Sequence, residues 1–98
     1  MIVMEFVFRT KPTSFSGSFL VDVLTKVVRA LETHDGIKLC FDDEEGLVAQ
    51  HGLNRIVVSI PRYSSTGPIE VRCDVYNLDG IKLCLKVIGV VMYVLQRR

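Results

Sequence analysis

The sequence has 98 residues and a mass of 11.0 kDa, which predicts a single domain spanning residues 1–98. Apolar residues make up 49% and charged residues 23%, which excludes the charge-rich composition of a disordered chain. Twelve basic and eleven acidic residues leave a net charge of +1, so no global field favours nucleic acid or an anionic membrane. The mean hydropathy of +0.34 is high for so small a domain, so we expect part of the apolar surplus to face a partner.

The first third of the chain predicts a strand followed by a helix. Residues 2–9 favour a strand that ends before Pro12, because proline lacks a backbone donor. A helix is expected at about residues 17–33, with Ser16 or Ser18 as its N-cap. Its buried face is predicted from the apolar residues that recur with the helical period, Leu20, Leu24, Val27, Val28 and Leu31.

Four short strands are expected to follow. Residues 37–41 alternate in polarity and predict a strand with one buried face, and the acidic turn 42–46 leads into a strand at 47–50. A further strand is predicted at 55–60, and residues 64–68 are expected to be the loosest loop. Residues 69–76 alternate most regularly, with Ile69, Val71, Cys73 and Val75 on the apolar side.

Residues 81–96 fit two structures. Asn77-Leu-Asp-Gly80 followed by alternating apolar residues is typical of a hairpin, whereas the unbroken length of the segment favours a helix, which we prefer. The helical face predicted to be apolar contains Ile81, Cys84, Leu85, Ile88, Met92 and Leu95. The hexapeptide Asp-Gly-Ile-Lys-Leu-Cys occurs at both 35–40 and 79–84, but the similarity ends there, which favours two similar turns over a duplication.

Few residues point to catalysis or metal binding. The cysteines lack the close pairing of a zinc site, and the acidic turn lacks the ligand pattern of a calcium loop, so we expect neither a metal nor a cofactor. A nucleophilic pair such as Cys40 with His51 stays open, although buried thiols are the expected role of Cys40, Cys73 and Cys84. The odd, widely spaced cysteines favour a reducing intracellular compartment.

No targeting or membrane segment is expected. The first nine residues lack a basic leader and a cleavage site of small residues. The longest apolar run, 87–95, is far shorter than the roughly 20 residues of a membrane helix.

Cations gather on the two predicted helices and form a candidate nucleic-acid interface. They are Lys26 and Arg29 on the first helix and Lys82, Lys86, Arg97 and Arg98 on or after the second. Cations without interleaved aromatic residues suit phosphate contact better than base recognition, and an ordinary solvated surface is the alternative.

The order of the predicted elements resembles one half of a sliding DNA clamp of the proliferating cell nuclear antigen and checkpoint clamp type. Residues 19–31 look like the first clamp helix, 46–60 like the following hairpin and 71–78 like the strand entering the second helix. The resemblance implies that Lys26, Arg29, Lys82 and Lys86 face duplex DNA in a central hole, and that the protein is nuclear. Clamp subunits contain at least two such halves, so the chain would be a fragment or a half-unit that assembles into a ring.

We therefore predict a single α+β domain with an antiparallel sheet and one or two helices on one face. The expected function is a non-enzymatic, clamp-like DNA-associated scaffold that is oligomeric or partner-bound. The alternative is a small interaction module or inhibitor, for example a viral one, that docks or dimerises through its apolar C-terminal segment. The interface residues expected in that segment are Val87, Ile88, Val91, Met92, Val94 and Leu95.

Overall fold

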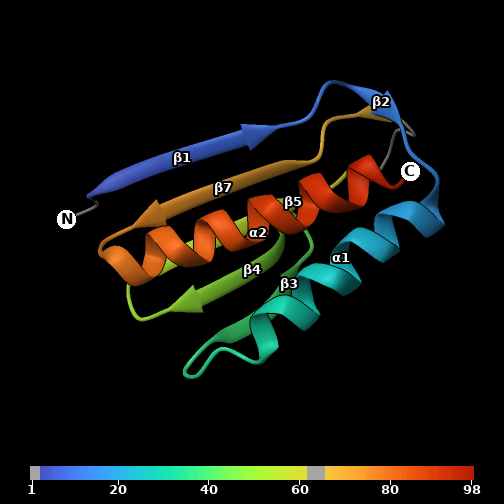
Figure 1. The fold of residues 1–98 in the computed structure, drawn as a ribbon. Coiled ribbons are helices and arrows are strands. Elements are labelled where there is room, and N and C mark those ends of the chain that lie inside the picture. Colours follow the sequence, from blue (N-terminus) through green and yellow to red (C-terminus); the bar gives the residue numbers. More distant parts are fainter. Residues whose placement is uncertain (1–2, 62–65) are drawn as a thin grey trace.

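A five-stranded antiparallel sheet lies beneath two helices in the computed structural model, which describes residues 3–61 and 66–98 (Figure 1). The sheet order is β1-β7-β5-β4-β3, and a small second sheet pairs β2 with β6. The strands are β1 (Met4–Arg9), β2 (Thr13–Ser14), β3 (Lys38–Asp42), β4 (Gly46–His51), β5 (Asn54–Ser59), β6 (Thr66–Gly67) and β7 (Glu70–Val75). The helices are α1 (Gly17–Glu32) and α2 (Leu78–Gln96). The predicted α+β class and element order are confirmed.

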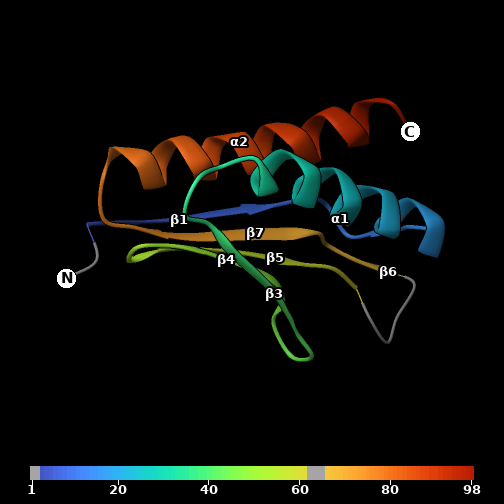
Figure 2. The same cartoon turned by 90° about the horizontal axis from the view of Figure 1, so that it is seen from below.

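Both helices cover the same face of the sheet and leave the other face uncovered (Figure 2). They lie side by side and run in opposite directions, and α2 also contacts β7 and β5 (Figure 1). The core fills the space between this helix layer and the sheet. Its fully buried large residues include Val23, Val27, Leu31, Leu47, Ile56, Ile69, Val71, Leu83, Val87 and Val91.

The first helix and the interior strand β7 follow their predicted patterns. Ser16 caps α1, because its hydroxyl accepts a hydrogen bond from the Phe19 amide at 3.1 Å. Val23, which the predicted face omitted, is fully buried, whereas Leu24 and Val28 are only half-buried. In β7 the predicted alternation is confirmed, with the odd-numbered residues from Val71 to Val75 buried beneath the helices.

The prediction that β3 buries one face is confirmed only in part, because Leu39 packs against the core and Phe41 does not. Leu39 is half-buried, and the Phe41 side chain is 64% exposed. Phe41 is exposed because β3 forms the edge of the sheet and pairs with β4 alone among the described strands.

Residue 2 of the predicted first strand and residues 64–65 of the predicted loop lie outside the described residues, while Thr66 and Gly67 form β6.

Residues 78–96 form the helix that we preferred, but the apolar face predicted for it is rotated. Leu85 is 58% exposed and Met92 is 44% exposed, whereas Leu83, Val87 and Val91 are buried. The helix carries apolar residues on most of its circumference, so periodicity alone could not select the side that packs against β7 and α1. Within the described chain, neither helix is long and apolar enough to cross a membrane.

A buried amide network fixes the start of α2. Asn54, at the beginning of β5, is 1% exposed; its Nδ2 donates to Asn77 Oδ1 at 2.9 Å, and its Oδ1 accepts from the Tyr76 amide at 2.8 Å. Asn77 is the N-cap and accepts from the Gly80 amide. A Cβ on Gly80 would overlap the Asn54 side chain, so only glycine allows this approach. Gly80, the residue that suggested a hairpin, therefore anchors a helix.

We predict that Gly80→Ala lowers the free energy of unfolding by about 2–4 kcal/mol, because the methyl group displaces Asn54 from its hydrogen bonds. Gly89→Ala is the matched control in the same helix. A Cβ there meets open space, so its higher helix propensity should raise stability by about 0.5–1 kcal/mol. Urea unfolding measures both variants, and equal effects of the two substitutions would contradict the proposed anchor.

Candidate functional site

The helix layer carries an excess of cations. Residues 17–32 and 78–98 contain six basic residues against three carboxylates, whereas the rest of the chain contains six basic residues and eight carboxylates. All six helix-layer cations are exposed, and they are those predicted as nucleic-acid contacts: Lys26, Arg29, Lys82, Lys86, Arg97 and Arg98. The near-neutral total charge thus conceals a positive helix layer above a negative remainder.

These six cations differ in their surroundings. Lys26 forms an ion pair with Asp22 one turn earlier, which reduces the charge it presents. Arg97 donates to the Tyr93 hydroxyl at 2.9 Å, and the Arg98 guanidinium lies 4.9 Å from the ring centre of Phe15. The other three pair with no carboxylate in the described part of the chain: Arg29, Lys82 and Lys86.

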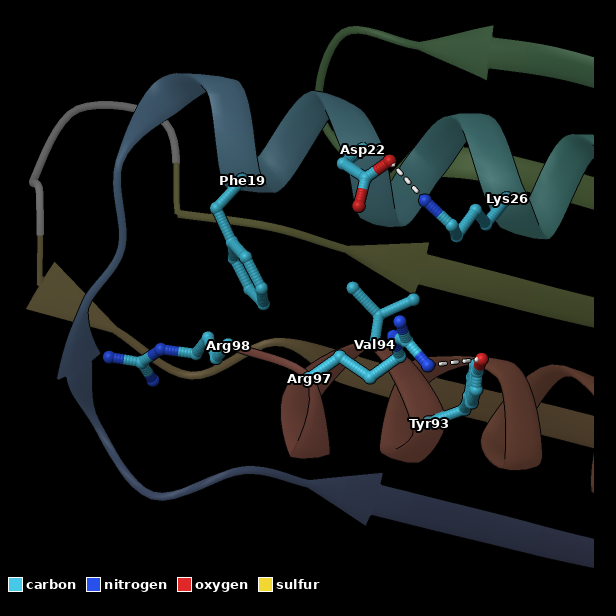
Figure 3. A pocket seen from close by; sticks show the side chains of 7 residues that line it. All are labelled: Phe19, Asp22, Lys26, Tyr93, Val94, Arg97 and Arg98. Atoms are coloured by element: carbon cyan, nitrogen blue, oxygen red, sulfur yellow. Dashed lines mark hydrogen bonds and ion pairs between the residues drawn. The ribbon is translucent and has the colours of Figure 1, made fainter.

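Three of the cations line one pocket between the first half of α1 and the end of α2 (Figure 3). The pocket has a volume of about 390 Å³ and is lined by Phe19, Asp22, Lys26, Tyr93, Val94, Arg97 and Arg98. One acid and three basic residues can attract an anion such as a phosphate. The structure does not place Lys82 and Lys86 in this pocket, because they lie in the first half of α2, and Arg29 lines a different groove.

The predicted interface in the C-terminal segment is partly wrong. Val87, Val91 and Val94 are at most 5% exposed and pack into the chain's own core. They are therefore not accessible to a partner in this fold. Ile88 and Leu95 are half-buried, and Met92 is exposed. Met92 and Leu95 line a shallow groove of about 340 Å³ beside the loop that follows β1.

A second apolar surface, absent from the sequence predictions, lies where α1 meets the edge strand β3. Val21 is 63% exposed and Phe41 is 64% exposed. With the half-buried Leu24 and Val28 they line a groove of about 410 Å³, which we call the α1–β3 groove. The one signal in the sequence was Val21, an apolar residue outside the predicted buried face of the helix.

The cysteines do not share the buried-thiol role that the sequence predicted. Cys73 and Cys84 form a disulfide that joins β7 to α2, with their Cα atoms 6.0 Å apart, and Cys40 is free and exposed. A reducing compartment would keep such a pair as thiols, so the compartment stays a prediction. Both cysteines of the pair are fully buried, so the packing that the sequence predicted for them is confirmed.

Cys40 and His51 do not form a nucleophilic pair. Cys40 is opposite Val48 in the sheet, and His51 lies three residues farther along β4, so alternation places their side chains on opposite faces. The His51 ring instead contacts the edge of His34, with 4.9 Å between ring centres. In residues 3–61 and 66–98, no group of three or more His, Cys, Asp or Glu residues could hold a metal ion.

The acidic turn between β3 and β4 has a structural role. Asp42 Oδ1 accepts hydrogen bonds from the amides of Glu44 and Glu45 at 2.7 and 2.9 Å. The Glu45 carboxylate pairs with Arg55 at 3.0 Å, and this hydrogen bond raises the pKa of the Arg55 guanidinium above its ordinary value. The turn thus uses these carboxylates to hold its own backbone and a neighbouring strand.

We predict that reducing the disulfide lowers the free energy of unfolding by about 2–3 kcal/mol, because the bond closes a short loop in the unfolded chain. A Cys40→Ser variant, unfolded in urea with and without dithiothreitol, measures the difference without interference from the free thiol. Adding Cys73→Ala and Cys84→Ala should abolish the effect of the reductant. Three alkylatable thiols in the wild-type chain unfolded without reductant would contradict the assignment.

Comparisons of the chain with protein-family models, curated proteins and solved structures find no match. They therefore neither support nor oppose the resemblance to a sliding clamp. The charges, grooves and edges of the structure are therefore the basis for its proposed function.

Proposed function

We propose that this chain is a non-enzymatic, DNA-associated scaffold that assembles with other chains and contacts duplex phosphates through its helix layer. The observation that carries the proposal is the segregation of charge onto that layer. Both helices lie on one face of the sheet, so their outer sides are turned away from the sheet in the same direction (Figure 2). This arrangement is consistent with the clamp-like role that the element order suggested.

The chemistry of this surface favours phosphate contact over base recognition. Arg29, Lys82 and Lys86 are exposed cations without carboxylate partners in the described chain. Lysine and arginine that neutralise phosphates release counterions, which gives binding with little sequence dependence. Arg97 and Arg98 are held against aromatic rings, so their guanidinium groups lose less freedom when they bind an anion. The proposed partner is therefore duplex DNA of any sequence.

We expect the full chain to shift the mobility of duplex DNA at low salt, with an affinity that falls steeply as salt increases. Each lost phosphate contact reduces the slope of log affinity against log salt by about 0.9. Lys82→Ala with Lys86→Ala should thus reduce the slope by about two. A mobility-shift titration at several salt concentrations provides the measurement.

Arg72→Ala is the matched control for this experiment. Arg72 is an exposed cation of β7, and the alternation that buries Val71 and Cys73 beneath the helices places it on the uncovered face of the sheet. Its removal should leave the salt slope unchanged. Binding that decreases equally in all variants, or no binding at any salt concentration, would contradict the proposal.

The second candidate function is a protein-interaction module, favoured by the α1–β3 groove. Exposed apolar side chains that line one groove typically mark a contact with another chain. This candidate replaces the interface first expected in the C-terminal segment, of which half is buried. A chain that stays soluble, fails to bind DNA and contacts a partner through Phe41 would favour it over the scaffold.

A further inference from the structure

The outer edge of β3 faces no other described strand and carries exposed apolar side chains. In the described chain β3 pairs with β4 on one side, and its other side has no strand. Soluble proteins usually protect such an edge, because free N–H and C=O groups invite pairing with another chain. Here Phe41 is 64% exposed beside it, and the α1–β3 groove continues the apolar surface onto α1. This edge is the strongest candidate for an interface.

We propose that β3 pairs antiparallel with β3 of a second copy of this chain, around a two-fold axis that passes between the two Cys40 residues. The five residues of β3 are Lys38-Leu-Cys-Phe-Asp42. In this register Lys38 is opposite Asp42 of the second copy, Leu39 is opposite Phe41, and Cys40 is opposite itself. Each charge therefore faces its opposite, and each apolar residue faces an apolar residue, which is the pairing that stabilises adjacent strands.

The two faces of the sheet support the same register. Side chains alternate along a strand, so Lys38, Cys40 and Asp42 share the uncovered face, and Leu39 and Phe41 share the helix side. A two-fold axis perpendicular to the sheet keeps both helix layers on the same side. The α1–β3 grooves of the two copies would then meet along the seam, where Phe41 of each copy is covered by the other.

The opposite edge of the sheet fits a second copy less well. On β1, Glu5 could face Arg9 of a second copy in a similar register around Val7. However, Arg9 already donates to the Glu70 carboxylate at 2.7 and 2.9 Å, so its charge is compensated within its own chain. On β3, Asp42 is also engaged within its own chain, through the Glu44 and Glu45 amides, but Lys38 has no carboxylate partner in the described chain and keeps its charge for a second copy. The observations therefore favour β3.

This inference deepens the proposed scaffold and depends on its claim of assembly, but it does not depend on DNA binding. It gives the assembly a defined geometry, a continuous ten-stranded sheet with four helices on one face. The paired surfaces of the two copies are identical, as in most homodimers. All measurements below are made without DNA, so a failure to dimerise and a failure to bind DNA are distinguishable.

Cysteine cross-linking tests the register without altering the seam. Opposite residues of antiparallel strands have Cα atoms about 4.5–5.5 Å apart, within the range that a disulfide spans. We expect diamide to convert most of the full chain into a covalent dimer. The two Cys40 thiols lose two protons and two electrons to diamide, which becomes the hydrazine, and one S–S bond forms. Cys40→Ser should give no covalent dimer.

Sedimentation velocity measures the same assembly without a covalent bond. We expect a dimer for the wild-type chain, and Lys38→Asp should weaken it at least about tenfold, because two attractive pairs become repulsive. Lys11→Asp makes the same charge change outside the seam and should leave the dimer intact. Circular dichroism confirms that both variants are folded, and their cross-linking yields should follow the same order.

Two results would overturn the proposal. The first is a monomer at all concentrations whose cross-linking is equally slow in the wild type and in Lys38→Asp. The second is a stable dimer in which Cys40 does not cross-link, while Val7→Cys in a Cys40→Ser background does. The second result would assign the interface to β1.

Discussion

The structure depends on covering one apolar face of a five-stranded sheet with two helices. The main core cluster lies between the helix layer and the sheet, and α2 lies over β7 and β5 with α1 packed beside it (Figure 2). This arrangement covers the centre of the sheet well and its β3 edge poorly, which leaves Phe41 exposed. The same arrangement leaves the outer sides of both helices free. The two surfaces to which we assign function, the helix layer and the β3 edge, follow from this single packing solution.

Sequence patterns predicted those elements whose environment is simple. The strand β7 could be predicted from its alternating sequence because one of its faces is buried and the other is exposed. The helix α1 could be predicted because its apolar residues lie on one side and its polar residues on the other. The buried face of α2 could not be predicted, because the helix carries its own apolar residues around most of its circumference. The repeated hexapeptide is the clearest case: 35–40 forms a turn and part of β3, whereas 79–84 is helical. At residues 79–84, the Asn77 cap and the contact of Gly80 with Asn54 favour the helix over the strand.

For the candidate sites, too, the sequence predicted which residues are involved but not the contacts that the fold gives them. The sequence identified all six helix-layer cations, but their pairing depends on contacts that the sequence does not reveal, such as Arg98 against Phe15. It also treated the three cysteines alike. The fold instead joins Cys73 to Cys84 across the β7–α2 contact and places Cys40 at an exposed edge. The importance of Phe41 could not be predicted, because the strand order determines which strand lies at the edge.

Lysine footprinting tests the central claim, that the helix layer contacts DNA while the β3 edge contacts a second copy. The chain has five lysines, one on α1, one on β3, two on α2 and one in the loop after β1: Lys26, Lys38, Lys82, Lys86 and Lys11. Duplex DNA should protect the three helix lysines from acylation and leave Lys11 reactive. Lys38 should become protected as protein concentration rises, whether or not DNA is present. Uniform reactivity under all conditions, or protection of Lys38 by DNA alone, would contradict the account.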